Sequence, residues 1–325
     1  ETAARRRMEP RGGEGAVAPT VESSLAEQKW RRLTPLAITA PDMALPLDPD
    51  VTPGRLPCGL RYFIKRNGRP ERRVALRLAV RVGSVLEADA ERGLAHVLEH
   101  LGFRATANYD RYELVAFFES IGAAFGACQN AYTAFDETVF MVQVPTDRPD
   151  PLRKAKGVLH EWACRIRISE EDVRAERSVV LEEWRAGRTS ANRAVEDYWA
   201  TLTAGSAYER RMPIGIESVI RGASAESIRD FYSRWYRLTQ MAVIVVGDVT
   251  PDDVIKLLTD EFSCEPPLSE SGAASVEAVL APLPIRHVPP HEIPRISTFV
   301  DDEASESEVC RDIRRDCRAE IAALR

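Results

Sequence analysis

The chain has 325 residues, of which 44% are hydrophobic and 29% are charged, proportions typical of a globular protein. Its formal net charge of -6 argues against nucleic acid or an anionic membrane as the main partner. No apolar run approaches the roughly 20 residues that a membrane-spanning helix needs. The length allows one large domain or two modest ones.

Cysteine usage indicates a reducing compartment. The six cysteines include no C-x-x-C pair, and the chain is too long to depend on disulfides as small secreted domains do. We therefore expect mostly free thiols and an intracellular, soluble protein, with the cytosol and an organelle (mitochondrion or plastid) both left open. The chain begins with Glu1 rather than Met, which indicates part of a longer protein.

Four segments differ in composition. Residues 1–50 are predicted to be a disordered tail, because they are rich in Arg, Ala, Gly and Glu and lack a clean apolar stretch. Residues 51–266 carry the periodic patterns of a folded domain, and 267–294 read as a Pro-rich linker. Residues 295–325 are expected to be the truncated start of a second domain, opening with a strand at 296–300.

Strands and helices alternate within 51–266. The clearest strand is 74–82, where apolar residues alternate with Ala and Arg, so one face should be buried. Ser169 is a good cap for a helix over 170–187, and Thr250 for one that starts at Pro251 and runs through Phe262. The other predicted strands are 60–65, 139–144 and 241–247. The other predicted helices are 90–103, 111–121, 150–166 and one that Ser224 caps and that contains Ile228, Phe231 and Trp235. This mixture, with adjacent strand pairs, predicts an α+β domain.

The strongest chemical signal is the sequence His96-Val97-Leu98-Glu99-His100. The two histidines are four apart on a predicted helix and share one face, which Glu99 also reaches. Two neutral imidazoles suit Zn²⁺, and a carboxylate beside a zinc-bound water can take its proton and pass it to a leaving amine. H-x-x-E-H is the inverzincin pattern. The alternative is a helix with two surface histidines, but the neighbouring residues are apolar and indicate a buried face.

A catalytic zinc ion takes three protein ligands, and the helix over 170–187 offers the third. Glu176 and Glu183 are seven apart and therefore share a face, together with Val179 and Val180, which we expect to be buried. Glu182 points elsewhere. Helix phase thus selects Glu183 as the ligand and Glu176 as an outer partner that orients the site. The alternative for Glu176 is an ordinary residue of an acidic helix.

Several stretches in the right order resemble the pitrilysin/insulinase family of zinc peptidases, which includes the mitochondrial processing peptidases. They are GLAHVLEHLGF at 93–103, NAYTAFDETVF at 130–140, ERSVVLEEW at 176–184, RMPIG at 211–215 and VIVVGD at 243–248. The amino-acid sequences of the second and third stretches look most like those of the PqqL-type zinc proteases. The resemblance implies the metallohydrolase fold of the mitochondrial processing peptidase/LuxS type, a mixed, mostly antiparallel sheet packed by helices.

The resemblance also implies roles for individual residues. It makes the chain a zinc metalloendopeptidase with one Zn²⁺ ion, held by His96, His100 and Glu183. Glu99 would be the general base that activates a zinc-bound water. Glu176 would belong to the catalytic residues as a carboxylate that orients the site without binding the zinc ion.

Residues Asn130, Ala131, Tyr132 and Thr133 match an edge strand that binds substrate backbone in this family. An extended peptide would add there as a further strand. Backbone hydrogen bonds would then give the affinity, so the binding would depend little on the amino-acid sequence of the peptide. Judged as a residue alone, Asn130 would instead be a turn residue. The expected substrates are peptides or unfolded polypeptides.

Family members resemble a clam shell of two halves, and groups from the second half complete the substrate site. The chain ends before such a half, so the possible partners are a second peptidase half or another copy of the chain, with no nucleic acid and no membrane span. Two alternatives to an active peptidase follow: a non-catalytic subunit that binds zinc and peptide, or an inert truncated product.

The remaining histidines and tryptophans carry weaker signals. His287 and His291 are four apart, but intervening prolines prevent a helix from aligning them as a metal site. His160 reads as an ordinary helix residue. Trp184 and Trp235 are expected to pack in the core rather than to bind a ligand.

Overall fold

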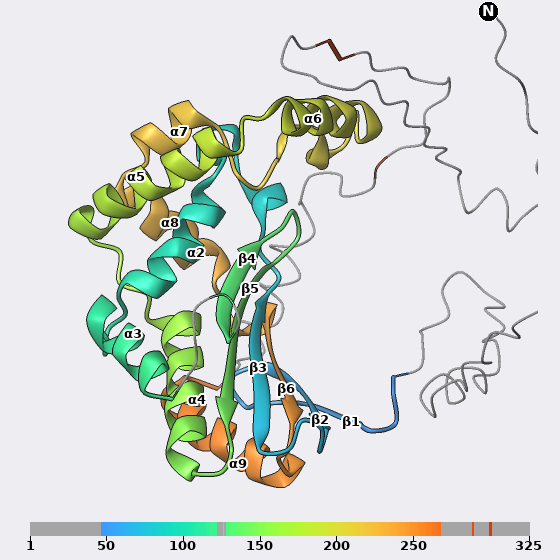
Figure 1. Ribbon diagram of the computed structural model, residues 1–325, viewed down its shortest axis with the longest axis vertical. Helices are drawn as coiled ribbons and strands as arrows, with labels where there is room; N and C mark the ends of the chain where they lie inside the picture. The colour runs from blue at the N-terminus through green and yellow to red at the C-terminus, as the bar shows by residue number, and fades with distance from the viewer. Residues whose placement is uncertain (1–46, 122–125, 127, 268–287, 289–298, 301–325) are drawn as a thin grey trace, which may run out of the picture. The chain divides into compact units, whose positions relative to one another are not determined.

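Six strands form one sheet in the order β1-β2-β6-β3-β5-β4 (Figure 1). The computed structural model describes residues 47–121, 126, 128–267, 288 and 299–300. The strands are β1 (Val51–Arg55), β2 (Arg61–Arg66), β3 (Arg73–Val80), β4 (Gln129–Thr133), β5 (Thr138–Pro145) and β6 (Met241–Gly247). Only β2 and β6 pair in parallel, and the other four pairs are antiparallel. The predicted α+β class with a mixed, mostly antiparallel sheet is confirmed.

The helices of the described residues pack mainly against one face of this sheet (Figure 1). They are α2 (Leu94–Arg104), α3 (Arg111–Ser120), α4 (Pro149–Cys164), α5 (Glu170–Ala186), α6 (Ser190–Leu202), α7 (Glu217–Gly222), α8 (Ala225–Trp235) and α9 (Pro251–Glu261). Five single turns of 3-10 helix are η1 (Ser84–Leu86), η2 (Asp89–Glu91), η3 (Ala207–Arg210), η4 (Leu238–Gln240) and η5 (Phe262–Cys264).

The core lies between the sheet and the helices. In β3 the buried side chains are every second one, Val74, Leu76, Leu78 and Val80, while Arg77 on the other face is exposed. This is the alternation that the sequence shows, and it arises because successive strand side chains point to opposite faces. The helices contribute large buried side chains to the same core, including Trp162, Phe118 and Phe231.

Every helix and strand predicted within 51–266 is present, with ends that shift by a few residues. The largest shift is in the helix that carries the histidines, because η2 occupies 89–91 and α2 begins only at Leu94. Gly93, at a φ of 107°, separates the two. The strand β1 and the helices α6 and α7 were not predicted from the residues.

All three predicted cap residues lie at the N-cap positions of their helices, and two of them form the cap hydrogen bond. Ser169 accepts a hydrogen bond from the Asp172 N–H, and Ser224 accepts one from the Ser227 N–H. Thr250 is the cap residue of α9, but its hydroxyl donates to the Asp253 side chain instead of accepting from a backbone N–H.

Gly93 and Gly215 lie against each other and fix the start of α2. Both have a positive φ, 107° and 75°, which favours glycine. A Cβ atom at Gly215 would lie 2.4 Å from the Cα of Gly93, so no side chain fits between the two backbones. The RMPIG segment thus ends in a glycine that packs directly under the helix bearing the histidines.

Other predictions concern residues outside those described. The predicted disordered tail lies outside them up to residue 46, and so does nearly all of the predicted linker at 267–294. The same holds for the pair His287 and His291, and for the predicted strand at 296–300 except residues 299 and 300. The four domain limits remain a prediction. Across the described residues, none of the helices combines the length and the apolar character that crossing a bilayer requires.

Candidate metal centre

The helix α2 places three polar side chains on one face and an apolar set on the other. Leu98 and Leu101 are fully buried in the core. His96, Glu99 and His100 point to the opposite side, where the His96 and His100 side chains are 12% and 21% exposed. The spacing of three and four residues accounts for this shared face, as the sequence predicted.

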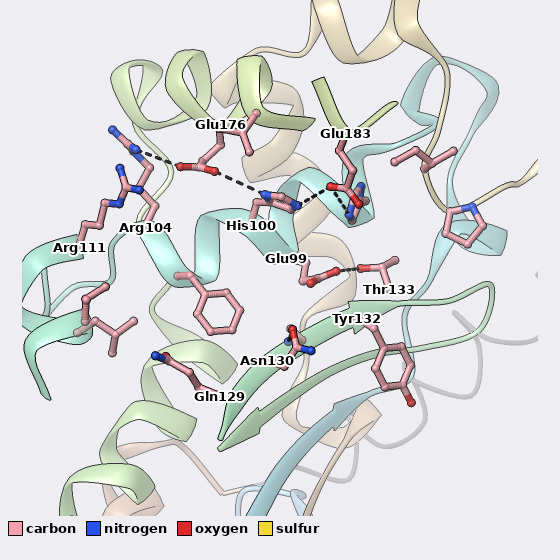
Figure 2. A pocket seen from close by; sticks show the side chains of 18 of the residues that line it. Glu99, His100, Arg104, Arg111, Gln129, Asn130, Tyr132, Thr133, Glu176 and Glu183 are labelled. Atoms are coloured by element: carbon pink, nitrogen blue, oxygen red, sulfur yellow. Dashed lines mark hydrogen bonds and ion pairs between the residues drawn. The ribbon is translucent and has the colours of Figure 1, made fainter. Parts of the chain in front are cut away.

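Glu183 comes from α5 and meets both histidines (Figure 2). Its Oε2 atom lies 3.7 Å from Nε2 of His96 and 3.4 Å from Nε2 of His100. One ligand atom from each of the three residues falls within 4.8 Å of the others. Two imidazoles and one carboxylate form a donor set that suits Zn²⁺ and leaves a fourth position for a water or substrate.

Glu176 lies behind His100, on the side away from Glu183. Its Oε2 atom is 3.5 Å from Nδ1 of His100, and its Oε1 atom accepts a 3.0 Å hydrogen bond from Arg104. Arg104 also donates a 3.1 Å hydrogen bond to Asp172. The chain from Asp172 through Arg104 and Glu176 holds the imidazole of His100 with its Nε2 atom turned to Glu183. Figure 2 shows the part of this chain from Arg104 to Glu183.

The predicted helix phase matches the positions of the glutamate side chains and is wrong for one valine. Glu182 is 72% exposed and pairs with Arg185, so it points away from the histidines. Val180 is fully buried as expected, but Val179 is 51% exposed and lines the cavity beside Glu176 and Glu183. The face that these glutamates share is therefore the wall of a cavity and not the core.

Glu99 is buried at the floor of the same site. Its Oε2 atom accepts a 2.7 Å hydrogen bond from the Thr133 hydroxyl of β4. Burial raises the pKa of Glu99, and the Thr133 hydrogen bond only partly offsets this. A buried carboxylate with a raised pKa, next to a candidate metal site, is suited to proton transfer near neutral pH.

The two histidines differ in protonation when no cation is bound. Burial, with a smaller contribution from His100, lowers the pKa of His96 to about 4. Burial would lower the pKa of His100 too, but its contacts with Glu176 and Glu183 outweigh burial and raise it to about 9. Burial also acts on Glu176, where the interactions with His100 and Arg104 prevail and lower the pKa.

The four substrate-strand residues lie on β4, at the edge of the sheet, so Asn130 is in a strand and not in a turn. Cys128 and Ala134, which flank the strand, hydrogen bond towards β5 at 2.7 and 2.8 Å. Since backbone groups alternate in direction, Ala131 and Thr133 direct theirs to the open side. The side chain of Asn130 accepts the Ala131 N–H at 2.9 Å.

A cavity of about 1020 Å³ lies between α5 and β4, with α2 at its back. Its walls include the metal-centre side chains and all four residues from Asn130 to Thr133. The rest of the lining is mixed: Phe103, Leu114, Val115 and Val179 are apolar, whereas Arg111, Glu119 and Gln129 are charged or polar. The cavity can therefore take an extended chain along β4 with its backbone close to Glu99.

Sequence reasoning missed three residues that position the site. Arg104 could have been found, since it continues the four-residue spacing of His96 and His100. Glu87 accepts hydrogen bonds from the N–H groups of Gly93 and Ala95 at 3.0 and 2.9 Å, at the start of α2. No local pattern marks this contact.

Burial raises the pKa of Glu87 to about 8, against the lowering effect of those two hydrogen bonds. Arg211, the first residue of RMPIG, donates to the Glu87 carbonyl at 2.8 Å and pairs with Asp89 at 2.9 Å. These contacts tie the 211–215 segment to the turn before α2.

Two family models match the chain. Residues 62–211 match the model described as insulinase (peptidase family M16), and residues 222–309 match the one described as peptidase M16 inactive domain. All nine predicted site residues lie within the first match. The second match begins within α7 and extends beyond the predicted limit at 266.

Proteins of similar sequence are named as zinc proteases. A zinc protease PQQL-like protein of Arabidopsis thaliana is 42% identical over 305 residues, which are 90% of this chain and 30% of that protein. A probable zinc protease PqqL of Haemophilus influenzae is 36% identical and covers 73% of this chain. This chain spans 26% of that second relative.

A solved structure has a similar fold. The crystal structure of the periplasmic protease PqqL from Escherichia coli aligns with a TM-score of 0.66 at 36% identity. The alignment covers 69% of this chain and 25% of that one.

Proposed function

Because the chain belongs to the insulinase family of peptidases (peptidase family M16), we propose that it binds one zinc ion and hydrolyses peptide bonds of peptides or unfolded polypeptides. The observation that carries this proposal is the meeting of His96, His100 and Glu183 within 4.8 Å of one another, beside the buried Glu99. The chain spans at most about a third of the length of the relatives named above. The activity is therefore proposed for the whole protein, in which these residues form the candidate centre.

In this proposal His96, His100 and Glu183 hold the zinc ion. When bound, zinc polarises a peptide carbonyl and lowers the pKa of a water molecule, which makes a nucleophile at neutral pH. Glu176 keeps the His100 ring oriented through its Nδ1 atom, while Arg104 fixes Glu176 from the other side.

Glu99 accepts the proton of the attacking water and passes it to the leaving amine. Its burial favours the exchange because the raised pKa brings its proton affinity closer to neutral pH. The Thr133 hydroxyl fixes the carboxylate at 2.7 Å and connects it to the strand where the substrate would lie.

The substrate would add to the sheet edge as an antiparallel or parallel strand along Asn130, Ala131, Tyr132 and Thr133. Ala131 and Thr133 supply the backbone groups on the open side. The Asn130 side chain must release the Ala131 N–H before a peptide can accept it. This mode recognises extended backbone, which folded proteins rarely offer.

Zinc binding should be measured on the 325-residue chain, and cleavage both on this chain and on the whole protein of which it is part. We expect one zinc ion at this centre and cleavage of a fluorescence-quenched peptide that a chelator abolishes. Glu99→Gln should lower kcat/KM about 10²- to 10⁴-fold, the usual contribution of a positioned proton-transfer group. Glu182→Gln is the matched control, because Glu182 is exposed and turned away. Undiminished cleavage by Glu99→Gln, or failure of His96→Ala to weaken zinc binding, would reject the proposal.

A second candidate is a unit that binds zinc and peptide without cleaving. The same assay separates the two: a chain that binds zinc and peptide but does not cleave would need a further peptidase half, supplied in cis or by another molecule.

A further inference from the structure

A second group of metal-ligating side chains lies away from the candidate zinc centre. It is formed by one end of α4 and by the turn η5 that follows α9, two helices that lie side by side in the fold (Figure 1). The group comprises His160 and Cys164 of α4 with Cys264 and Glu265. The first two are four apart and share one helix face.

His160 is the centre of this group and is only 2% exposed. Its Nε2 atom lies 2.8 Å from Oε1 of Glu265 and 4.0 Å from Sγ of Cys264. The Cys264 sulfur is 3.9 Å from the same Glu265 oxygen. Ligand atoms of His160, Cys164 and Glu265 fall within 4.8 Å of one another.

A tetrahedral zinc site is slightly tighter than this group. Ligand atoms at their usual zinc distances lie about 3.4–3.8 Å apart, the longest separations being those between sulfurs. The Cys264 sulfur exceeds this range only slightly in its separations from His160 and Glu265. Cys164 is placed only within the 4.8 Å limit, so both sulfurs and the Glu265 oxygen would shift when an ion binds. The donor set of two thiolates, one imidazole and one carboxylate is soft enough to select zinc over magnesium or calcium.

We propose that His160, Cys164, Cys264 and Glu265 bind a second divalent zinc ion, which fastens the end of α9 to α4. With four protein ligands the site has no open position, so its role is structural and not catalytic. Glu261 and Lys156 support it from outside: Glu261 faces Nδ1 of His160 at 3.3 Å, and Lys156 pairs with Glu261 at 2.9 Å.

The alternative is a metal-free cluster in which His160 lies between the carboxylates of Glu261 and Glu265. In that cluster the Cys264 sulfur accepts from Arg165 at 3.5 Å and donates to the Glu261 carbonyl at 3.7 Å. It gives no role to the Cys164 thiol, which lies beside the same histidine and carboxylate. A metal would replace the thiol protons and make both sulfurs ligands.

Cobalt distinguishes this site from the other one. We would titrate the reduced, metal-free chain with Co²⁺ and follow thiolate-to-cobalt charge-transfer absorption in the near ultraviolet. The His96, His100 and Glu183 centre contains no sulfur and cannot produce that band, so the outcome does not depend on the proposed peptidase function. We expect two cobalt ions per chain and a clear thiolate band.

Three variants complete the experiment. Cys264→Ser should weaken the band, because it removes one of the two sulfur ligands. Cys264 is exposed, so we expect this variant to fold. Cys164→Ser/Cys264→Ser should abolish it and leave one cobalt ion per chain. Cys128→Ser, a thiol outside the group, is the control and should keep the full band. A wild-type chain without the band, or a double variant that retains it, overturns the proposal. A band unchanged by Cys264→Ser overturns the four-residue ligand set.

Discussion

Arg104 donates a 3.0 Å hydrogen bond to Glu176 on the side opposite His100. The guanidinium and the imidazole thus hold one carboxylate between them, and Asp172 in turn accepts a bond from Arg104. This arrangement makes the orientation of a candidate zinc ligand depend on two residues that never approach the metal position.

Replacing Arg104 should therefore weaken zinc binding. We expect Arg104→Gln to raise the Kd for zinc about 10- to 100-fold, the usual effect of losing a residue that orients a ligand. The measurement is competition with a chelating dye. Arg185→Gln is the control, because Arg185 forms only an exposed pair with Glu182. Equal affinities in the two variants would contradict a role for Arg104 in positioning His100.

The two neighbouring glutamates of α5 should differ sharply in their effect on zinc. Glu183→Gln removes a candidate ligand and should weaken zinc binding by more than the roughly 10- to 100-fold expected for an outer partner. Glu182→Gln should leave the Kd unchanged, since its side chain is 72% exposed. Titration of both variants with zinc checks this. A similar loss in both would show that net charge on the helix, and not ligation, sets the affinity.

Gly215 should not tolerate a side chain. Gly215→Ala combines a φ of 75° with a Cβ atom 2.4 Å from the Gly93 backbone, so we expect a loss of unfolding free energy of about 1–3 kcal/mol or more. Gly222→Ala is the matched control, because nothing lies within 4 Å of its Cβ position and its φ is not in the left-handed region. It should be neutral or stabilise by up to about 1 kcal/mol. Chemical denaturation of both variants gives the comparison.

Asp172 should make stability depend on pH. Burial by itself would raise its pKa, but hydrogen bonds from Ser169 and Arg104 and the charge of Arg167 lower it overall. A carboxyl whose folded pKa lies below its unfolded value stabilises the fold above the unfolded pKa, near 4. That contribution is lost as the pH falls through the folded pKa.

We expect Asp172→Asn to cost about 1–3 kcal/mol at pH 7, the scale of hydrogen bonds to charged groups. The difference from wild type should shrink as the pH falls below about 4, where the wild-type carboxyl gains its proton. Urea denaturation at a series of pH values tests this. A difference that stays constant down to acid pH would show that the loss comes from packing and not from the charge.

Local periodicity accounts for what the sequence predicted well. The spacing of His96, Glu99 and His100 places them on one face of their helix whatever surrounds it. In the same way, a separation of seven residues places Glu176 and Glu183 on one face of α5. Strands such as β3 were predictable because one face is buried and the alternation follows. These features depend on neighbours in the chain.

Features that depend on distant segments could not be predicted in this way. Val179 was assigned to the core because it is apolar, yet it faces a cavity whose other wall comes from β4. The start of α2 was placed too early because its limit is set by contact between Gly93 and Gly215, 122 positions later. Glu87 and Arg211 meet for the same reason, through tertiary packing and not through a motif.

The hydrogen bond from the Ala131 N–H to the Asn130 side chain bears on aggregation. An open sheet edge is a template for any exposed strand, including the same edge of another copy, and proteins usually block it with charge, proline or a bulge. Here the block is a neutral amide on the strand itself, which can swing aside. The contact occupies the N–H of Ala131 alone, so a peptide that adds to this edge has to compete for a single N–H group.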